Sequence, residues 1–330
     1  VQAQDYAGAK WAVGQRTREA NEASLDEAFN EGRILRTHVL RPTWHFVAPA
    51  DIRWLLALTA PRVNGVNGTM YRQCELDEAL FARSNKAIAE ALVGGRFLTR
   101  TELGTVLERH GLKAKGVRLA YIIMRAELDA VVCSGPRRGK QFTYALLDER
   151  APQAKSLPYD EALAELTRRY FTGHGPATVD DFAWWSGLNK TQCRAGLDMV
   201  GNSLGQETVD DQTYWLAPDR PLVKEPSPTA HLLPNFDEYL LSYRETHPFL
   251  DPAHVHLIET RNPIFGHSLV IDGRMVGTWR RDFQKNTVII TLRRFAALSE
   301  NHEEAIHIAA ERFGQFVGMG VELRSDVELS

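Results

Sequence analysis

Cysteine is scarce in this sequence, long apolar runs are missing, and neither sign of charge is in large excess. The three cysteines among 330 residues, Cys74, Cys133 and Cys193, form no CxxC pair, which argues against a disulfide framework and a structural zinc site. No run approaches the ~20 apolar residues that a membrane helix needs, and no secretory signal is recognised. A composition of 44% hydrophobic and 25% charged residues excludes disorder and coiled coil as the main structure. We therefore expect a globular protein of the reducing cytoplasm, with two or more domains.

The formal charge of −3 hides an asymmetry along the chain. The first 150 residues carry 22 Lys and Arg against 17 Asp and Glu, whereas the remainder carries 17 against 25. A mildly basic first part permits an anionic partner on that side. The excess is far smaller than that of a histone, so charge alone does not predict nucleic-acid binding.

A unit of two helices followed by a β-hairpin recurs along the chain and is clearest at 98–147. Thr99 and Glu102 have the spacing of a capping box that opens a helix, and Gly111 stops it. The expected elements are helices at about 99–110 and 115–128 and strands at 130–133 and 141–146, with a basic hairpin tip at 134–140. This order is typical of a winged helix, in which the second helix enters the major groove and the hairpin tip meets phosphate.

A second copy of the unit is expected at 176–217. The pairs with capping-box spacing are Thr178 with Asp181 and Asn189 with Gln192. Strands follow at about 206–209 and 214–217. The turn between these strands, at 210–212, is acidic, and phosphate would repel it. We expect this copy to be scaffold.

A third, less complete copy is expected at 24–58. Ser24 and Glu27 have capping-box spacing, strands are expected at 34–40 and 43–47 with a turn at Arg41-Pro42, and a helix at 51–58. Three agreeing copies carry more weight than one, and they predict helix-turn-helix-plus-hairpin units in tandem.

The C-terminal part has a different pattern. Prolines mark a linker, namely Pro218, Pro221, Pro226 and Pro228. Asp272-Gly273 supplies the positive φ angles of a type I′ hairpin turn between strands at 269–271 and 275–279. A strand at 287–292 and a final helix at about 300–317 complete a small, mostly β domain.

These patterns predict an α+β fold of tandem winged-helix units with a small β-barrel-like domain at the C-terminal end. The expected divisions are 1–85, a first unit that is incomplete at its N-terminal side; 86–155, a second unit with the basic wing; 156–225, a third unit; and 226–330, the mostly β domain. Motifs for nucleotide binding, serine hydrolysis and zinc proteolysis do not occur. His254 and His256 would face one way on a strand, but no third ligand has convincing spacing, so surface histidines are the preferred interpretation and no metal is expected.

Three segments in order resemble the AlkZ/YcaQ-like DNA glycosylases, a bacterial winged-helix family. They are Val1-Gln2-Ala3-Gln4-Asp5-Tyr6, Leu40-Arg41-Pro42-Thr43-Trp44-His45-Phe46-Val47, and Leu232-Leu233-Pro234-Asn235-Phe236-Asp237-Glu238-Tyr239. The resemblance covers essentially the whole chain. It implies excision of alkylated bases and unhooking of interstrand crosslinks, with a Gln-x-Gln pair at the floor of a DNA channel. Gln2 and Gln4 match that pair and are the expected catalytic residues; a polar helix terminus is the alternative.

A neutral amide cannot act as a base at pH 7, whereas the carboxylate of the family's other branch can. Gln4 can orient a water molecule through its carbonyl oxygen. That suffices for an N7-alkylated purine, which is cationic and departs neutral, so no general acid is needed. The expected enzyme is a monofunctional DNA glycosylase restricted to cationic lesions, without metal or cofactor. Asp5 is a rival carboxylate, although neighbouring side chains diverge.

Further site residues are expected from the resemblance and from the basic segments. The expected DNA contacts are Arg41, Trp44 and His45, Lys113, Lys115 and Arg118 at the start of the second helix, and Arg137, Arg138 and Lys140 at the wing. Trp44 and His45 are alternatively a buried structural pair. Asn235, Asp237 and Tyr239 are possible channel residues, with Asp237 either channel-facing or structural.

The expected partner is double-stranded DNA with alkylated or crosslinked purines, bound by a monomer in the cytoplasm at the nucleoid. The alternative is a winged-helix DNA-binding protein without enzymatic activity, such as a transcriptional regulator or a genome-maintenance adaptor. A regulator would normally dimerise and read a palindrome through a polar recognition helix. The apolar second helix of the clearest unit and the acidic turn at 210–212 favour lesion recognition instead.

Overall fold

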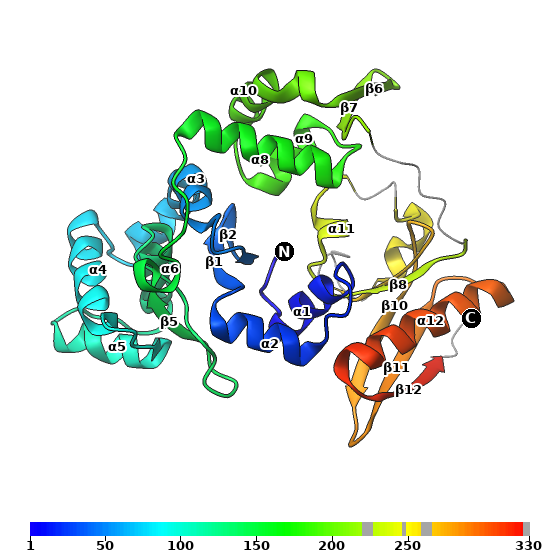
Figure 1. Ribbon diagram of the computed structural model, residues 1–330, viewed down its shortest axis with the longest axis horizontal. Coiled ribbons are helices and arrows are strands. Elements are labelled where there is room, and N and C mark those ends of the chain that lie inside the picture. The colour runs from blue at the N-terminus through cyan, green and yellow to red at the C-terminus, as the bar shows by residue number, and fades with distance from the viewer. Residues whose placement is uncertain (220–226, 246–248, 259–265, 326–330) are drawn as a thin grey trace. The chain divides into compact units, whose positions relative to one another are not determined.

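The chain divides into two compact units in the computed structural model (Figure 1). One unit consists of Val1–Asp26 together with Asp219–Ser330, and the other of Glu27–Pro218. The structure describes residues 1–219, 227–245, 249–258 and 266–325. The N-terminal segment therefore folds with the C-terminal part of the chain, and the finer four-part division stays a prediction. Of the linker prolines, Pro221 and Pro226 lie outside the described residues.

The first unit is built on an open five-stranded sheet with strand order β12-β11-β10-β9-β8. Neighbouring strands are antiparallel except for the parallel pair β11–β12. Its elements are α1 (Tyr6–Gly14), β8 (Ala230–Leu233), α11 (Glu238–Leu241), the 3₁₀ helix η2 (Pro252–Leu257), β9 (Ser268–Ile271), β10 (Arg274–Phe283), β11 (Thr287–Arg294), α12 (Glu300–Val317) and β12 (Gly320–Ser325). Because β12 adds to the free edge of β11, these strands leave β8 and β12 as two edges. The described residues thus form no closed barrel, and the barrel-like expectation is wrong.

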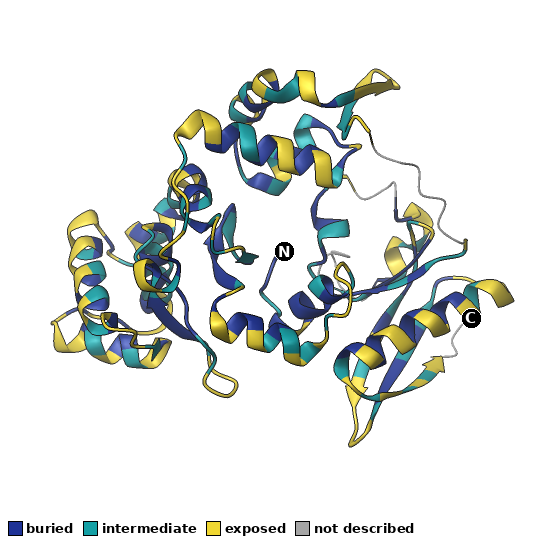
Figure 2. Ribbon diagram, in the orientation of Figure 1, coloured by how far each residue is buried: buried dark blue, intermediate teal, exposed yellow. Residues whose placement is uncertain are grey.

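Two tryptophans join α1 and the sheet to strand β8. The indole N–H of Trp11 donates to the Leu232 carbonyl oxygen at 2.6 Å, and that of Trp279 donates to the Leu233 carbonyl oxygen at 2.8 Å. Phe313 of α12 packs edge-on against both rings, with centroid distances of 5.0 and 5.3 Å. Helix α12 buries this side and exposes the other (Figure 2). The core of the unit therefore fixes α1, and with it the segment that precedes it.

Local sequence signals at this end of the chain are confirmed. Helix α12 has the predicted bounds, because Ser299 caps its start and Gly318, with φ of 70°, ends it. Asp272 and Gly273 both have positive φ, 46° and 80°, as a type I′ turn requires.

The second unit consists mainly of helices with three small sheets, β1-β2, β3-β5-β4 and β6-β7. Helix α2 (Glu22–Glu31) contains the boundary between the units. The elements are β1 (Leu35–Val39), β2 (Arg41–Val47), α3 (Ile52–Gln73), α4 (Glu78–Leu92), β3 (Leu98–Thr99), α5 (Arg100–Arg109), α6 (Gly116–Leu128), β4 (Val132–Ser134), β5 (Thr143–Leu146), α7 (Leu147–Arg150), α8 (Tyr159–His174), α9 (Val179–Ser186), α10 (Lys190–Val200), the 3₁₀ helix η1 (Gly201–Ser203), β6 (Gly205–Val209) and β7 (Gln212–Leu216). The capping boxes predicted at Thr99, Thr178 and Asn189 are all present.

Three local predictions at 24–58 are wrong. Asn21, not Ser24, opens α2: its side chain accepts the Ser24 N–H at 2.9 Å, and the Ser24 hydroxyl accepts the Asn21 N–H at 3.1 Å. The hairpin turns at Leu40, with φ of 65°, so Arg41 and Pro42 already lie in β2. The helix expected over 51–58 continues to Gln73 through Pro61, because tertiary packing of its inner face outweighs the local breaker.

Candidate active site and nucleic-acid interface

The predicted Gln pair lies directly before helix α1 in the first unit. Asp5 caps this helix: its backbone is extended, and its carboxylate accepts the Ala7 N–H at 3.1 Å. Asp5 also lies 3.8 Å from the Arg281 guanidinium. The rival carboxylate therefore has a structural role. Gln4 lies in the bend just before the helix, and Gln2 forms a β-bridge two residues earlier.

Gln2 and Gln4 are held differently. Gln2 is buried, and its main-chain N–H donates to Oε1 of Glu238 at 3.2 Å. Gln4 is half-buried, and its side-chain oxygen Oε1 accepts no hydrogen bond from any residue that the structure describes. Nearly all buried polar atoms in proteins have a partner, so an unused buried acceptor is a mark of a functional position. Oε1 of Gln4 is available to a water molecule or a ligand.

The segment that contains Asn235 packs closely on α1. A Cβ atom added at Gly8 would lie 2.9 Å from Oδ1 of Asn235 and 2.9 Å from Oδ2 of Asp5. Oδ1 of Asn235 is itself buried and accepts no hydrogen bond within the described part of the chain. Among the described residues, Gln4 and Asn235 thus have unused amide oxygens, and they belong to the two segments that meet at the start of α1.

Asp237 is structural, one of the two roles left open for it. Its side chain is fully buried and forms a two-pronged ion pair with Arg16, at 2.7 and 3.0 Å. It also accepts the Tyr239 N–H at 2.8 Å and so caps α11. Burial alone would lower the pKa of Arg16, but the charge and hydrogen bonds of Asp237 outweigh it and raise that pKa.

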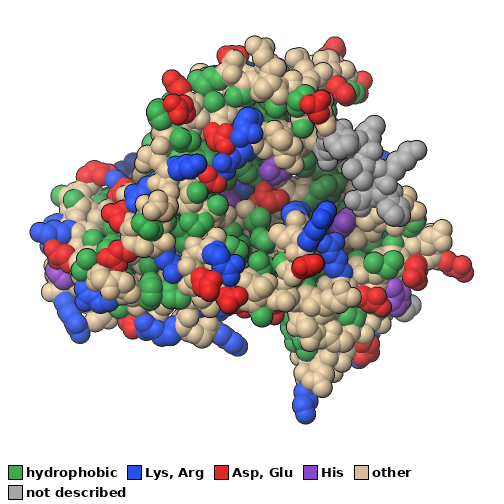
Figure 3. Space-filling view, viewed as in Figure 1, with side chains coloured by type: hydrophobic (Ala, Val, Ile, Leu, Met, Phe, Trp, Pro, Cys, Tyr) green, Lys and Arg blue, Asp and Glu red, His purple; other side chains and the backbone are tan. Residues whose placement is uncertain are grey.

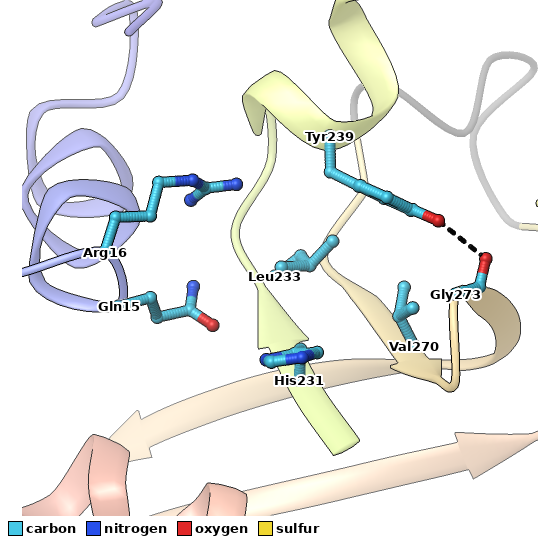
Figure 4. Close-up of a pocket in the computed structure, with 7 residues that line it drawn as sticks. All are labelled: Gln15, Arg16, His231, Leu233, Tyr239, Val270 and Gly273. Atoms are coloured by element: carbon cyan, nitrogen blue, oxygen red, sulfur yellow. Dashed lines mark hydrogen bonds between the residues drawn. The ribbon is translucent and has the colours of Figure 1, made fainter. Parts of the chain in front are cut away.

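Tyr239 lines a cavity of about 320 Å³ in the first unit (Figure 4). The other lining residues are Gln15, Arg16, His231, Leu233, Val270 and Gly273. The Tyr239 hydroxyl donates to the Gly273 carbonyl oxygen at 2.8 Å, which fixes the type I′ turn. Nε2 of Gln15 is buried and finds no acceptor among the described residues. The predicted channel residue Tyr239 therefore holds the turn and walls this cavity.

In the second unit, Arg36 lies between two aromatic rings. Its guanidinium carbon is 4.2 Å from the ring centroid of Trp44 and 4.3 Å from that of Phe142. The His38 ring covers Trp44 at 4.3 Å, and the Arg137 guanidinium lies 5.2 Å from Phe142. We call these five residues, Arg36, His38, Trp44, Arg137 and Phe142, the Arg36 stack. Stacking between aromatic rings restricts the motion of the planar guanidinium group. The group is therefore oriented in advance for binding an anion.

Three residues of the Arg36 stack, Arg36, Trp44 and Phe142, line a second cavity of about 380 Å³. The residues that line it are Arg36, Trp44, Thr99, Arg100, Thr101, Lys140, Gln141, Phe142 and Tyr144. Three cationic side chains, hydroxyl groups and aromatic faces are the groups that bind nucleic-acid backbones. Among the predicted contacts, Trp44 and Lys140 are brought together here.

The other predicted basic contacts are held by the protein to different degrees. Arg138 donates to Glu102 at 2.8 Å and to the Phe97 carbonyl oxygen at 2.9 Å. The Thr99 main-chain N–H, together with Arg138, lowers the pKa of Glu102 to about 2. Arg138 is therefore locally neutralised, whereas Lys140 at the same hairpin tip is exposed.

The basic residues predicted to contact DNA at the start of α6 also differ in how far the protein holds their side chains. Arg118 donates to the main-chain oxygens of Lys113, at 2.8 Å, and Cys74, so its guanidinium braces the turn. Lys113 is exposed, and exposed Lys115 lies 3.3 Å from Glu108. On the face shown in Figure 3, acidic side chains lie among the basic ones.

Arg41 and His45 in β2 are less accessible than expected of phosphate contacts. His45 is buried, and its Nδ1–H donates to the Thr43 carbonyl oxygen at 3.0 Å. Arg41 is half-buried and packs its stem near Gly187, where an added Cβ would lie 3.2 Å from Cγ of Arg41. These placements favour a structural role for His45.

Sequence reasoning missed Glu238 in the first unit and Arg36, Arg100 and Phe142 in the second. Glu238 lies within the 232–239 segment that the sequence analysis singled out. Its position next to Asp237, at the start of a short helix, is the feature of the sequence that could have indicated it. Arg36 and Trp44 approach each other through the hairpin, which the two predicted strands imply. Phe142 and Arg100 are brought there by long-range packing, for which the sequence has no local signal.

The described residues contain no group of three or more His, Cys, Asp or Glu side chains that could hold a metal ion. His254 and His256 lie on the 3₁₀ helix η2, not on a strand, and the His254 ring packs 5.3 Å from Phe295. Within the same part of the chain, no helix is long and apolar enough to cross a membrane.

The chain thus combines an α+β fold, amide oxygens on Gln4 and Asn235 that accept no hydrogen bond within the described residues, and a cavity lined by three cationic side chains and aromatic rings. The model of the family described as DNA glycosylase AlkZ-like matches residues 1–316. The chain belongs to this family of DNA glycosylases, and the predicted family and class of enzyme are confirmed.

Two comparisons with individual proteins agree. The chain is 25% identical over 295 residues to the interstrand DNA cross-link repair glycosylase of Streptomyces sahachiroi, which covers 84% of this chain and 79% of that protein. The solved structure of Streptomyces sahachiroi DNA glycosylase AlkZ matches with a TM-score of 0.81 at 22% identity. This match covers 98% of this chain and 90% of the other, and it supports the fold.

Proposed function

We propose that this DNA glycosylase hydrolyses the N-glycosidic bond of cationic, N7-alkylated purines in double-stranded DNA, including purines joined in interstrand crosslinks. The family supports glycosidic hydrolysis, and the name of the Streptomyces sahachiroi relative supports crosslinks as a substrate. The residues proposed to act on the substrate are Gln2 and Gln4, without metal or cofactor.

The chemistry fits a site made of neutral amides. When the bond between C1′ and N9 breaks, its electron pair moves to the base and cancels the positive charge of an N7-alkylated purine. The base leaves neutral, so no acid is needed to protonate it. Water adds to C1′ and releases one proton to solvent. The site must then hold the water and stabilise the developing sugar cation, each worth roughly 2–4 kcal/mol.

The single observation that carries this proposal is the buried Oε1 of Gln4, which accepts no hydrogen bond from the described residues. A carbonyl oxygen accepts a hydrogen bond from water and so orients the lone pair of that water toward C1′. It also presents partial negative charge to a cationic sugar. Gln2, held through its main chain by Glu238, fixes the segment on the other side.

At the level of the fold, we propose winged-helix units within the second unit. The order α4, β3, α5, α6, β4 and β5 supports one such unit, and α8, α9, α10, β6 and β7 support another. The proposed DNA contacts are the exposed Lys113, Lys115 and Lys140 together with Arg36 and Arg100 of the second cavity. A chain with tandem units needs no second copy to follow a duplex, so we expect a monomer, acting at the bacterial nucleoid in the cytoplasm.

Base release from two duplexes of the same sequence tests the proposal, one with N7-methylguanine and one with uracil at the same position. Uracil in DNA is neutral and departs as an anion, so its release requires protonation or strong anion stabilisation. N7-methylguanine departs as a neutral base and requires neither. We expect single-turnover release of N7-methylguanine at least 100-fold faster than release of uracil. Equal rates for both bases, or no release of N7-methylguanine, would contradict the proposal.

A further inference from the structure

Arg281 is a poorly exposed arginine of β10 whose guanidinium contacts two different parts of the first unit. Its side chain is 14% exposed. Nη1 donates to Nε2 of His267 at 2.6 Å, and Nη2 lies 3.8 Å from Oδ2 of Asp5. The guanidinium carbon lies 5.6 Å from the ring centroid of Trp279 and 5.8 Å from that of Phe313. Arg281 therefore connects the sheet and its aromatic core to the carboxylate that caps α1.

His267 restrains the arginine from the side of the sheet. Burial and the charge of Arg281 lower the pKa of His267 to about 4, so the imidazole is neutral at pH 7 and its Nε2 accepts a hydrogen bond. The His267 ring packs edge-on against Trp279 at a centroid distance of 4.9 Å. The planar guanidinium has several donors in a fixed geometry, so one donor can bond His267 while another faces Asp5.

Asp5 transmits this restraint to the Gln pair, because Gln4 directly precedes it. Oδ1 of Asp5 accepts the Ala7 N–H at 3.1 Å, while Oδ2 faces Arg281. Oε1 of Gln4 accepts no hydrogen bond from the described residues, so none of them fixes this oxygen directly. Its placement depends on the backbone that carries Gln4, and Asp5 holds that backbone on its C-terminal side.

We propose that Arg281 is a positioning residue of this glycosylase, which fixes Gln4 for the reaction by holding the carboxylate of Asp5. The inference rests on the proposed role of Gln4 in orienting the attacking water. Arg281 acts through Asp5 and needs no contact with the substrate. A misplacement of a reacting group by about 1 Å can slow an enzyme by about 100-fold, so a contact that restrains the backbone next to Gln4 affects the rate.

The experiment is a double-mutant cycle in the full chain with Arg281→Gln, Asp5→Asn and the two changes combined. Asparagine caps a helix about as well as aspartate, so Asp5→Asn keeps the cap and removes the charge that faces Arg281. Arg324→Gln is the matched control, because Arg324 lies in β12 of the same sheet, pairs with Glu322 at 2.7 Å and is 54% exposed. The measurements are single-turnover release of N7-methylguanine from duplex DNA at saturating protein, affinity for the same duplex, and the thermal midpoint of unfolding.

We expect Arg281→Gln and Asp5→Asn each to slow release by about 10- to 30-fold, with duplex affinity within about threefold of wild type. Because both changes break the same contact, the combined variant should be at most about threefold slower than the slower single variant. A merely structural role would lower the thermal midpoint without coupling the two rates. Arg281→Lys keeps the charge and should recover part of the rate, and Arg324→Gln should stay within about twofold of wild type.

The possible results separate the explanations. Release at the wild-type rate by Arg281→Gln, or a combined variant slowed by the product of the two single effects, would overturn the proposal. If Arg281→Gln does not fold, Asp5→Asn decides, because a wild-type rate in this variant would refute the link from Asp5 to Gln4. If the wild-type chain releases no N7-methylguanine, the proposed function fails and this inference with it. An active wild type with two slow, non-additive variants supports both.

Discussion

At the scale of single residues, the polar side chains around α1 are of two kinds. Some stabilise the local structure, and others have a polar atom that remains available to a water molecule or a substrate. Asp5 caps the helix and Asp237 is paired with Arg16. Oε1 of Gln4 has no partner in the described residues. The proposed function depends on that difference, because only an unused acceptor can bind the attacking water.

The ion pair of Arg16 and Asp237 predicts an asymmetry in stability. Asp237 is fully buried, whereas 41% of the Arg16 side chain is exposed. Arg16→Met leaves a buried carboxylate without its cation and should cost about 3–5 kcal/mol of unfolding free energy. Asp237→Asn leaves a cation that water can reach and should cost only about 1–2 kcal/mol. Urea denaturation checks the order; equal losses, or a larger loss for Asp237→Asn, would contradict it.

His267 predicts a dependence of stability on pH. Burial, together with Arg281, whose guanidinium donates to Nε2 at 2.6 Å, lowers the pKa of His267 to about 4. Between pH 6.5 and pH 4 the unfolded chain binds a proton that the folded chain does not, so stability falls as pH falls through this range. The loss from this group is roughly 2–3 kcal/mol.

The variant His267→Asn removes the titrating group but keeps an acceptor for Arg281. We expect its unfolding free energy to decline less between pH 6.5 and pH 4 than that of the wild type. The comparison isolates His267, because carboxylates titrate in both proteins. Parallel declines would show that His267 does not stay neutral in the folded chain.

At the scale of elements, close packing of α1 on the segment around Asn235 is required to hold the Gln pair. A side chain at Gly8 would meet Oδ1 of Asn235 and Oδ2 of Asp5, each at 2.9 Å, and Cβ of Pro234 at 3.2 Å. Gly8→Ala should therefore cost about 1–3 kcal/mol of stability through overpacking and slow base release.

Gly65 provides the matched control, because it lies in helix α3 and an added Cβ would meet no atom within 4 Å. Gly65→Ala should raise stability by about 0.5–1 kcal/mol and leave base release unchanged. Thermal unfolding and single-turnover assays measure both. A Gly8→Ala protein with wild-type rate and stability would show that this contact is not tight in solution.

The second cavity, which Arg36, Trp44 and Phe142 line together with Arg100 and Lys140, makes a prediction about DNA binding. If Arg100 and Lys140 contact phosphates, Arg100→Gln and Lys140→Gln should each reduce the slope of log affinity against log salt by about 0.9. Lys86→Gln, on the exposed face of α4 near Glu90, is the control and should leave the slope unchanged. Phe142→Ala should weaken binding by releasing Arg36. Unaltered slopes for both cavity variants would remove this cavity from the DNA interface.

At the scale of the whole chain, the sequence predicts features that are set within a few residues. The capping boxes at Thr99, Thr178 and Asn189, the Asp272-Gly273 turn and the bounds of α12 are local, and all are confirmed. The family and the glycosylase class, inferred from three short segments in order, are confirmed by the family model.

Features that depend on long-range packing were missed or wrong. Asn21 and Ser24 are both good caps, and local preference did not decide between them. Leucine rarely adopts the positive φ angle that Leu40 has, so the sequence does not predict the turn there. The pairing of β12 with β11 depends on the packing of the whole sheet. Glu238 approaches Gln2 across 236 positions of sequence, so only folding reveals that contact.

The most direct test of the central claim is the single-turnover release of N7-methylguanine from duplex DNA by Gln4→Ala and Gln2→Ala variants. If the amide of Gln4 orients the attacking water, Gln4→Ala should slow release by about 100-fold while duplex affinity stays within about threefold of wild type. Gln2→Ala should also be slow. Release at the wild-type rate by both folded variants would contradict the account.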